Sequence, residues 1–171
     1  MEILVVLLIL VTAGYGIVKL IRNRLQRAKQ DARREAELLG LAVGEVKRDI
    51  PFGTGFGQQY RLEARTCVRY CLSHGESGAP RWSLLMRSDS DTVPPFPPGW
   101  QLVVPDGILS EQLQQELISV AENWQEEFLE LEGSNASVCA FWEEWGGVTQ
   151  ARRIYDYLQR LSAAMKSSQG R

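Results

Sequence analysis

The chain has few histidines and cysteines, the residues on which zinc sites and thiol catalysis depend. Its 171 residues include one histidine, His74, and three cysteines, Cys67, Cys71 and Cys139. An odd and sparse set of cysteines is typical of a reducing compartment and forms no dense disulfide framework. A single bond from Cys67 or Cys71 to Cys139 stays open as an alternative.

The spacing of Cys67, Cys71 and His74 is C-x3-C-x2-H, and Cys139 offers a fourth ligand for zinc. The segment with the first two cysteines alternates like a strand, in which they lie about 13 Å apart, too far for one ion. A thiol or hydrolytic enzyme that pairs Cys67, Cys71 or Cys139 with His74 is an alternative hypothesis. We assign no catalytic, metal-binding or cofactor-binding residue and expect no cofactor.

Phosphate-binding motifs and a positive overall charge are also missing. Gly53, Gly55 and Gly57 are spaced G-x-G-x-G, which matches neither the dinucleotide fingerprint nor the P-loop. The net charge is -2, and residues 51–147 carry five Lys/Arg against fourteen Asp/Glu. Because an acidic domain repels phosphate backbones, we expect no nucleic-acid partner.

One long hydrophobic run is present, at residues 3–18, and it contains no charge. Lys19 can extend its ammonium group to the membrane interface, so the usable stretch reaches Ile21, close to the ~20 residues that span a bilayer. We predict a transmembrane anchor over residues 1–21. A secretory signal peptide is the alternative, but Glu2 stands where such a peptide carries basic residues.

Basic residues follow the hydrophobic run before the first acidic one, Asp31; they are Lys19, Arg22, Arg24, Arg27 and Lys29. A basic flank stays on the cytoplasmic side, which predicts a single-pass protein with its N-terminus outside and its C-terminal domain cytoplasmic. The same five residues are candidate contacts for anionic lipid headgroups. Residues 22–40 lack proline and favour helix, so we expect a basic juxtamembrane helical stalk. Anchor and stalk are also candidate homodimer contacts.

The rest of the chain predicts an α+β domain over residues 59–166, after a Gly/Pro-containing linker at 41–58 and before a disordered tail at 167–171. Alternating residues 60–73 and the segment 81–87 predict a hairpin, and a short apolar run follows at 101–104. Helical spacing begins after the N-cap Ser110 and again after Gly147, on either side of a second predicted hairpin. We therefore expect an antiparallel sheet of about five strands packed by two helices. This order resembles that of type III secretion chaperones and related small α+β adaptor folds, and the resemblance implies a binding module.

Large aromatic residues stand beside acids in the second hairpin, at Trp142, Glu143, Glu144 and Trp145. This composition suits a partner-binding surface, although the two tryptophans can instead pack beneath the last helix. Our leading hypothesis is a membrane-tethered, non-enzymatic adaptor or assembly factor that binds another protein. A membrane-anchored immunity-type inhibitor is a further alternative.

Overall fold

The computed structural model describes residues 2–52, 61–75, 78–86, 96–105, 107–124, 128–144 and 146–167. Within these ranges it describes all side chains except those of residues 2–11, 13, 49–52, 61–63, 65, 86 and 128. The described chain forms three helices and six strands, in this order: α1 Glu2–Leu38, β1 Ala42–Phe52, β2 Arg61–Ser73, β3 Trp82–Met86, β4 Trp100–Val103, α2 Glu111–Asn123, β5 Phe128–Gly133, β6 Ser137–Trp142 and α3 Gly147–Ser167.

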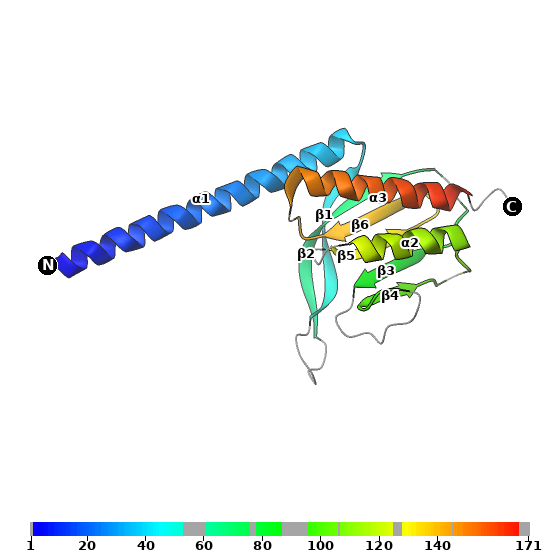
Figure 1. Ribbon diagram of the computed structural model, residues 1–171, viewed down its shortest axis with the longest axis horizontal. Coiled ribbons are helices and arrows are strands. Elements are labelled where there is room, and N and C mark those ends of the chain that lie inside the picture. Colours follow the sequence, from blue (N-terminus) through cyan, green and yellow to red (C-terminus); the bar gives the residue numbers. More distant parts are fainter. Residues whose placement is uncertain are drawn as a thin grey trace.

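The strands form one sheet with the order β1-β2-β6-β5-β3-β4, in which all neighbouring strands are antiparallel. The prediction of an α+β fold with an antiparallel sheet is confirmed, and the described sheet has six strands where about five were expected. Helices α2 and α3 lie side by side across one face of the sheet, and the C-terminal part of α1 lies along α3 (Figure 1).

Strand β1 occupies most of the segment that the sequence analysis assigned to a linker. It pairs with β2 along its whole length, from Ala42 opposite Cys71 to Phe52 opposite Arg61. Gly44 and a proline at position 51 interrupt its alternation, which is why the segment does not read as a strand. Residues 53–58 of the expected linker lie outside the described residues, as do Gly53, Gly55 and Gly57.

The predicted pairing of the first two segments is wrong. Strand β2 lies between β1 and β6, whereas β3 lies between β5 and β4. Strand β2 pairs with β1 along one edge and with β6 along the other, so a hairpin between β2 and β3 would require β3 to take the position of β6. The predicted β5–β6 hairpin is confirmed, and in its turn the Ser134 amide donates to the Ser137 carbonyl at 2.8 Å.

The core lies between the sheet and the helices. Both predicted amphipathic helices bury the expected faces, with Leu113 and Leu117 of α2 and Ile154 and Leu158 of α3 fully covered. The hydroxyl of Ser110 accepts a hydrogen bond from the Leu113 amide at 3.3 Å and so caps the start of α2. Burial of these apolar side chains is the main force that holds the layers together.

Helix α1 is a single helix of 37 residues. It ends before Gly40, whose φ of 85° lets the Leu41 amide reach back to the Ala36 carbonyl at 2.9 Å. Its N-terminal part extends beyond the domain (Figure 1). Among the helices of the described part of the chain, none is long and apolar enough to cross a membrane. The side chains of residues 3–11, which form half of the predicted anchor, lie outside the described ones.

Candidate functional site at the junction of α1 and the domain

Small residues bring the C-terminal part of α1 into close contact with the domain. Ala32 and Ala36 are fully buried on the face of α1 that meets α3. At the first residue of α3, a Cβ built on Gly147 would lie 3.8 Å from the Ala28 Cβ. Because these side chains are small, the two helices can pack without a gap, and the packing begins at Ala28.

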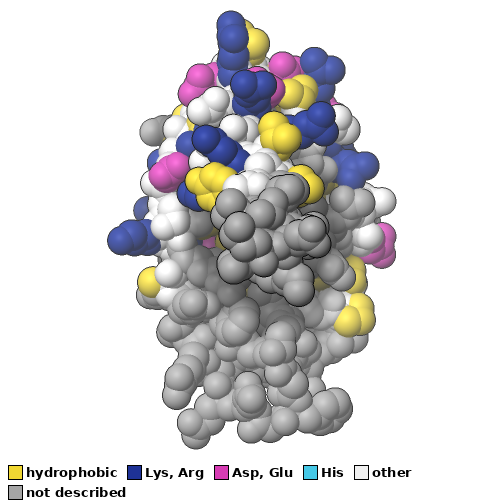
Figure 2. All heavy atoms as spheres, turned by 90° about the vertical axis from the view of Figure 1, so that its left-hand side faces the viewer, with side chains coloured by type: hydrophobic (Ala, Val, Ile, Leu, Met, Phe, Trp, Pro, Cys, Tyr) yellow, Lys and Arg dark blue, Asp and Glu magenta, His cyan; other side chains and the backbone are white. Residues whose placement is uncertain are grey.

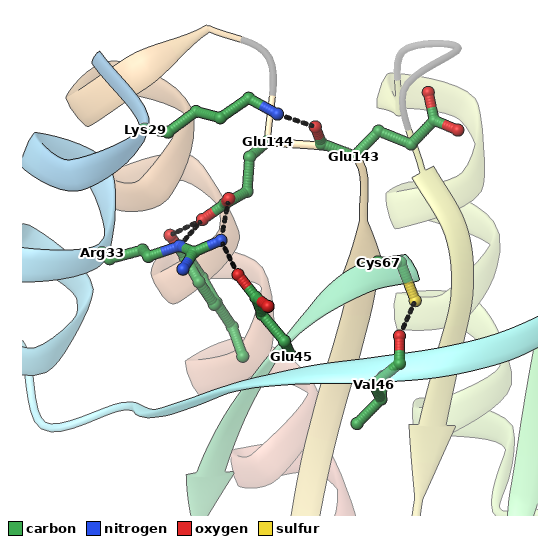
Figure 3. A network of polar contacts seen from close by, with 8 residues as sticks. Lys29, Arg33, Glu45, Val46, Cys67, Glu143 and Glu144 are labelled. Atoms are coloured by element: carbon green, nitrogen blue, oxygen red, sulfur yellow. Dashed lines mark hydrogen bonds and ion pairs between the residues drawn. The ribbon is translucent and has the colours of Figure 1, made fainter. Parts of the chain in front are cut away.

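An ion pair fixes this contact (Figure 3). The guanidinium of Arg33 on α1 donates to Glu144 through Nε at 2.7 Å and Nη2 at 2.6 Å, and Nη2 also lies 2.8 Å from a carboxylate oxygen of Glu45 on β1. The Glu144 side chain is 1% exposed and that of Arg33 is 33% exposed. A two-pronged contact of this kind specifies the position of both partners.

The charges at the junction depend on one another. The hydrogen bond to Glu144 raises the pKa of Arg33, although burial acts in the opposite direction. Burial, together with the negative charge of Glu144, raises the pKa of Tyr70, whose hydroxyl lies 3.5 Å from the Glu144 carboxylate. Arg33 therefore stays a cation and Tyr70 stays a neutral donor at physiological pH.

The backbone of Glu144 is itself unusual. Its φ is 56°, and among the described residues it is the one non-glycine residue with positive φ. This conformation costs energy for a residue with a side chain, so it persists where surrounding contacts hold it. Here it directs the carboxylate back into the junction, toward Arg33 (Figure 3). The Tyr70 hydroxyl donates to the same carboxylate.

Two further contacts flank the ion pair along α1. The ammonium of Lys29 donates to the Glu143 carbonyl at 3.5 Å, and Arg152 of α3 donates to Glu35 at 2.7 Å. Successive turns of α1 are thus attached to the domain from Lys29 to Ala36. The C-terminal part of α1 is therefore in contact with the domain over about two turns.

Two of the four residues predicted for a partner surface are buried in the structure. Trp142 is fully buried in the core, edge-on to the Tyr70 ring at a centroid distance of 5.3 Å. Glu144 is buried in the junction, Glu143 is half-buried, and Trp145 lies outside the described residues. In this segment the aromatic Trp142 belongs to the core, and the acidic Glu144 belongs to the junction with α1.

The predicted headgroup contacts divide into two groups. Lys19, Arg22, Arg24 and Arg27 are exposed on the projecting part of α1, whereas Lys29 is half-buried at the junction. Figure 2 shows Lys and Arg side chains gathered on the side of the molecule from which α1 projects.

The cysteines are placed by the sheet. Cys71 and Cys139 are opposite one another on β2 and β6 and form a disulfide with a Cα–Cα distance of 4.1 Å. Cys67 is buried, burial raises the pKa of its thiol, and its sulfur lies 3.7 Å from the Val46 carbonyl. Nδ1 of His74 is 2.9 Å from the Gly75 carbonyl. Within the described residues, no three His, Cys, Asp or Glu side chains are arranged to hold a metal ion.

A second polar cluster lies on the sheet face opposite the helices, and none of its residues was singled out from the sequence. Arg48 of β1 forms ion pairs with Glu132 and, at 3.6 Å, with Glu130, both on β5. Its guanidinium lies 4.3 Å from the centroid of the Phe141 ring. Burial, with the nearby charge of Glu132, raises the pKa of Glu130 to about 7, although Arg48 opposes the shift. A cavity of about 330 Å³ adjoins Glu132.

The fold and the junction together define an antiparallel α+β domain with a docked, projecting N-terminal helix. Comparison of the chain with models of protein families, with curated proteins and with solved structures gives no match. The element order that resembles type III secretion chaperones lacks β1, so it differs from the order observed.

Proposed function

We propose that this protein is a single-pass, membrane-tethered adaptor or assembly factor without enzymatic activity, in which α1 is both the anchor and the arm that positions the domain. The observation that carries the proposal is the junction. One continuous helix joins the hydrophobic N-terminal run to residues that Arg33 and Glu144 fix in the domain. Such a connection sets the position of a binding domain relative to a membrane.

The projecting part of α1 supports insertion into a bilayer. Tyr15, Ile17, Val18, Leu20 and Ile21 are between 54% and 71% exposed. With a turn of about 100° per residue, these five side chains spread over about 220° of the helix circumference, and Gly16 and Lys19 occupy the remaining arc. Residues 3–18 carry no charge on any side of the helix. Such a helix requires an apolar environment, and a bilayer supplies one.

The basic flank supports a cytoplasmic domain, because positive residues beside a span are retained on that side. The disulfide between Cys71 and Cys139 favours an oxidising compartment instead, since cytoplasmic thiols are kept reduced. We propose the cytoplasmic orientation, in which the two cysteines are held as a reduced pair at the same positions. The redox state of this pair in cells therefore reports the side of the membrane.

The experiment is extraction of native membranes with alkali, combined with a C-terminal reporter that is active only in the cytoplasm. The proposal predicts a full-length chain that resists extraction and an active reporter. A variant with Leu8→Arg and Val11→Arg should be extracted, because a charge at the centre of a span costs about 3 kcal/mol. Release of the unchanged chain by alkali would reject the anchor, and an inactive reporter would reject the orientation.

The protein partner is tested separately, by cross-linking in intact membranes. The adaptor proposal predicts a reproducible partner that is retained by the full chain and lost by a chain unfolded through the core, such as one carrying Leu158→Asp. Absence of any specific cross-linked product in repeated preparations would count against an adaptor.

A further inference from the structure

The exposed basic residues of α1 lie on one broad side of the helix. With a turn of about 100° per residue, Lys19, Arg22, Arg24 and Arg27 spread over about 200° of the circumference. Apolar side chains occupy the rest, at Val18, Ile21, Leu25 and Ala28. We name the four basic residues the basic collar; they follow the uncharged residues 3–18, so they lie where the proposed span ends.

A second copy of the chain is the first occupant to consider for this part of α1. Val18, Ile21, Leu25 and Ala28 follow the alternating spacing of three and four that coiled coils use. In a parallel pair, however, the positions beside this stripe would hold Arg22, Arg24 and Lys29 in both copies. Like charges at these positions repel, so the charge of the collar favours a partner of opposite charge.

The distance along α1 places the collar at the level of lipid headgroups. Eight residues separate Ile21 from Lys29, where contacts with the domain begin, which is about 12 Å of helix. The headgroup region on each side of a bilayer is about 5–8 Å thick. No flexible joint lies between the collar and the junction, since α1 is continuous and is attached from Lys29 onward.

We propose that the basic collar of α1 binds the phosphate layer of an anionic bilayer and that the Arg33–Glu144 junction holds the domain above this layer in one fixed orientation. The inference rests on the proposed membrane anchor. It specifies which end of the domain faces the lipid: the start of α3, which lies against Ala28, is near the headgroups, and the end of α3 is remote from them.

A fluorescent donor, placed at one of two positions on α3, tests this orientation in the full chain. The chain is reconstituted into vesicles that contain phosphatidylglycerol and carry an acceptor for fluorescence energy transfer on their headgroups. The donor is attached to a cysteine introduced as Thr149→Cys or as Ala163→Cys. Both positions are exposed, and they are separated by about 21 Å along the helix. All three native cysteines are buried, so the label reacts at the introduced residue.

The inference predicts strong energy transfer from Thr149→Cys and at least severalfold weaker transfer from Ala163→Cys. Arg33→Met should make the transfer efficiencies from the two labelled positions similar. Arg34→Met, a change at the exposed neighbour, should leave them different. Replacing Arg22, Arg24 and Arg27 by Gln should remove any gain in transfer that anionic vesicles give over purely zwitterionic ones.

The outcomes separate this inference from the anchor itself. Equal and strong transfer at both positions, in a chain that resists alkali, would overturn the fixed orientation and leave the anchor standing. No transfer at either position, in a chain that alkali releases, would overturn both. The increase in energy transfer from zwitterionic to anionic vesicles can also be the same with the native arginines and with the triple Gln substitution. That result would overturn the role of the collar.

Discussion

Arg33 and Glu144 are 111 residues apart in the chain and are joined by two hydrogen bonds of 2.7 and 2.6 Å. The contact links the projecting helix to the turn that follows β6, and the carboxylate in it is nearly inaccessible to water. A buried carboxylate is tolerated where a cation and donors compensate it. The pair therefore determines both the stability of the domain and the direction in which α1 leaves it.

Replacing Arg33 by Met should lower the free energy of unfolding by about 3 kcal/mol, because the Glu144 carboxylate stays buried without its cation. The value lies at the lower end of the range for buried pairs, since Arg33 keeps a third of its exposure. Urea unfolding of the full chain in a mild detergent measures the effect. Arg34→Met is the matched control and should change the stability by less than ~0.5 kcal/mol; equal effects of the two changes would contradict the account.

The stability should depend on pH through Glu130. Burial raises the pKa of its carboxyl from an ordinary value near 4.5 to about 7. Between these two values the folded protein holds a proton that the unfolded chain releases, so the stability falls as the pH rises through this window and levels off above it. Glu130→Gln should flatten that slope in thermal unfolding curves recorded between pH 5 and pH 8, while Glu122→Gln, at an exposed position on α2, should keep it.

Reduction of the Cys71–Cys139 bond should destabilise the domain by about 4 kcal/mol, because the bond closes a loop of 68 residues that the reduced chain leaves open. Unfolding with and without a reductant measures the difference. The doubly substituted chain, Cys71→Ser with Cys139→Ser, should be insensitive to reductant. A wild-type chain equally stable in both conditions would show that the bond adds nothing to folding.

Gly133 should not accept a side chain. A Cβ at this position would overlap the indole ring of Trp82, which is fully buried against the opposite strand. We expect Gly133→Ala to cost about 1–3 kcal/mol through displacement of that ring. Gly44→Ala on β1, where nothing lies within 4 Å of the added methyl group, should be close to neutral in the same unfolding measurement.

Local patterns predicted the parts of the fold that depend on local structure. The amphipathic faces of α2 and α3 and the turn after Gly133 follow from spacing and turn residues alone. Strand β1 was missed because glycine and proline break its alternation, and its place is decided by pairing with β2. That omission also hid the partner of Glu130 and Glu132, because Arg48 was assigned to a linker.

The junction could not be predicted from spacing. Arg33 reads as one more basic residue of a stalk, and Glu144 as one of several acids in an aromatic hairpin. What distinguishes them is the positive φ of Glu144 and its burial, and both arise from long-range packing of α1 on α3. A sequence signal exists only in the small residues Ala28, Ala32 and Ala36, which mark the side of α1 that packs closely.

If α1 and the domain move as one body, the distance between them has a single value, and its measurement is the most direct test. Spin labels at Asn23→Cys on the projecting part of α1 and at Arg153→Cys on α3 occupy exposed positions on either side of the junction. Pulsed electron resonance of the full chain in vesicles should give one narrow distance distribution, which Arg33→Met broadens. A broad distribution in the doubly labelled chain that keeps Arg33 would mean that α1 is a flexible stalk and would contradict the account.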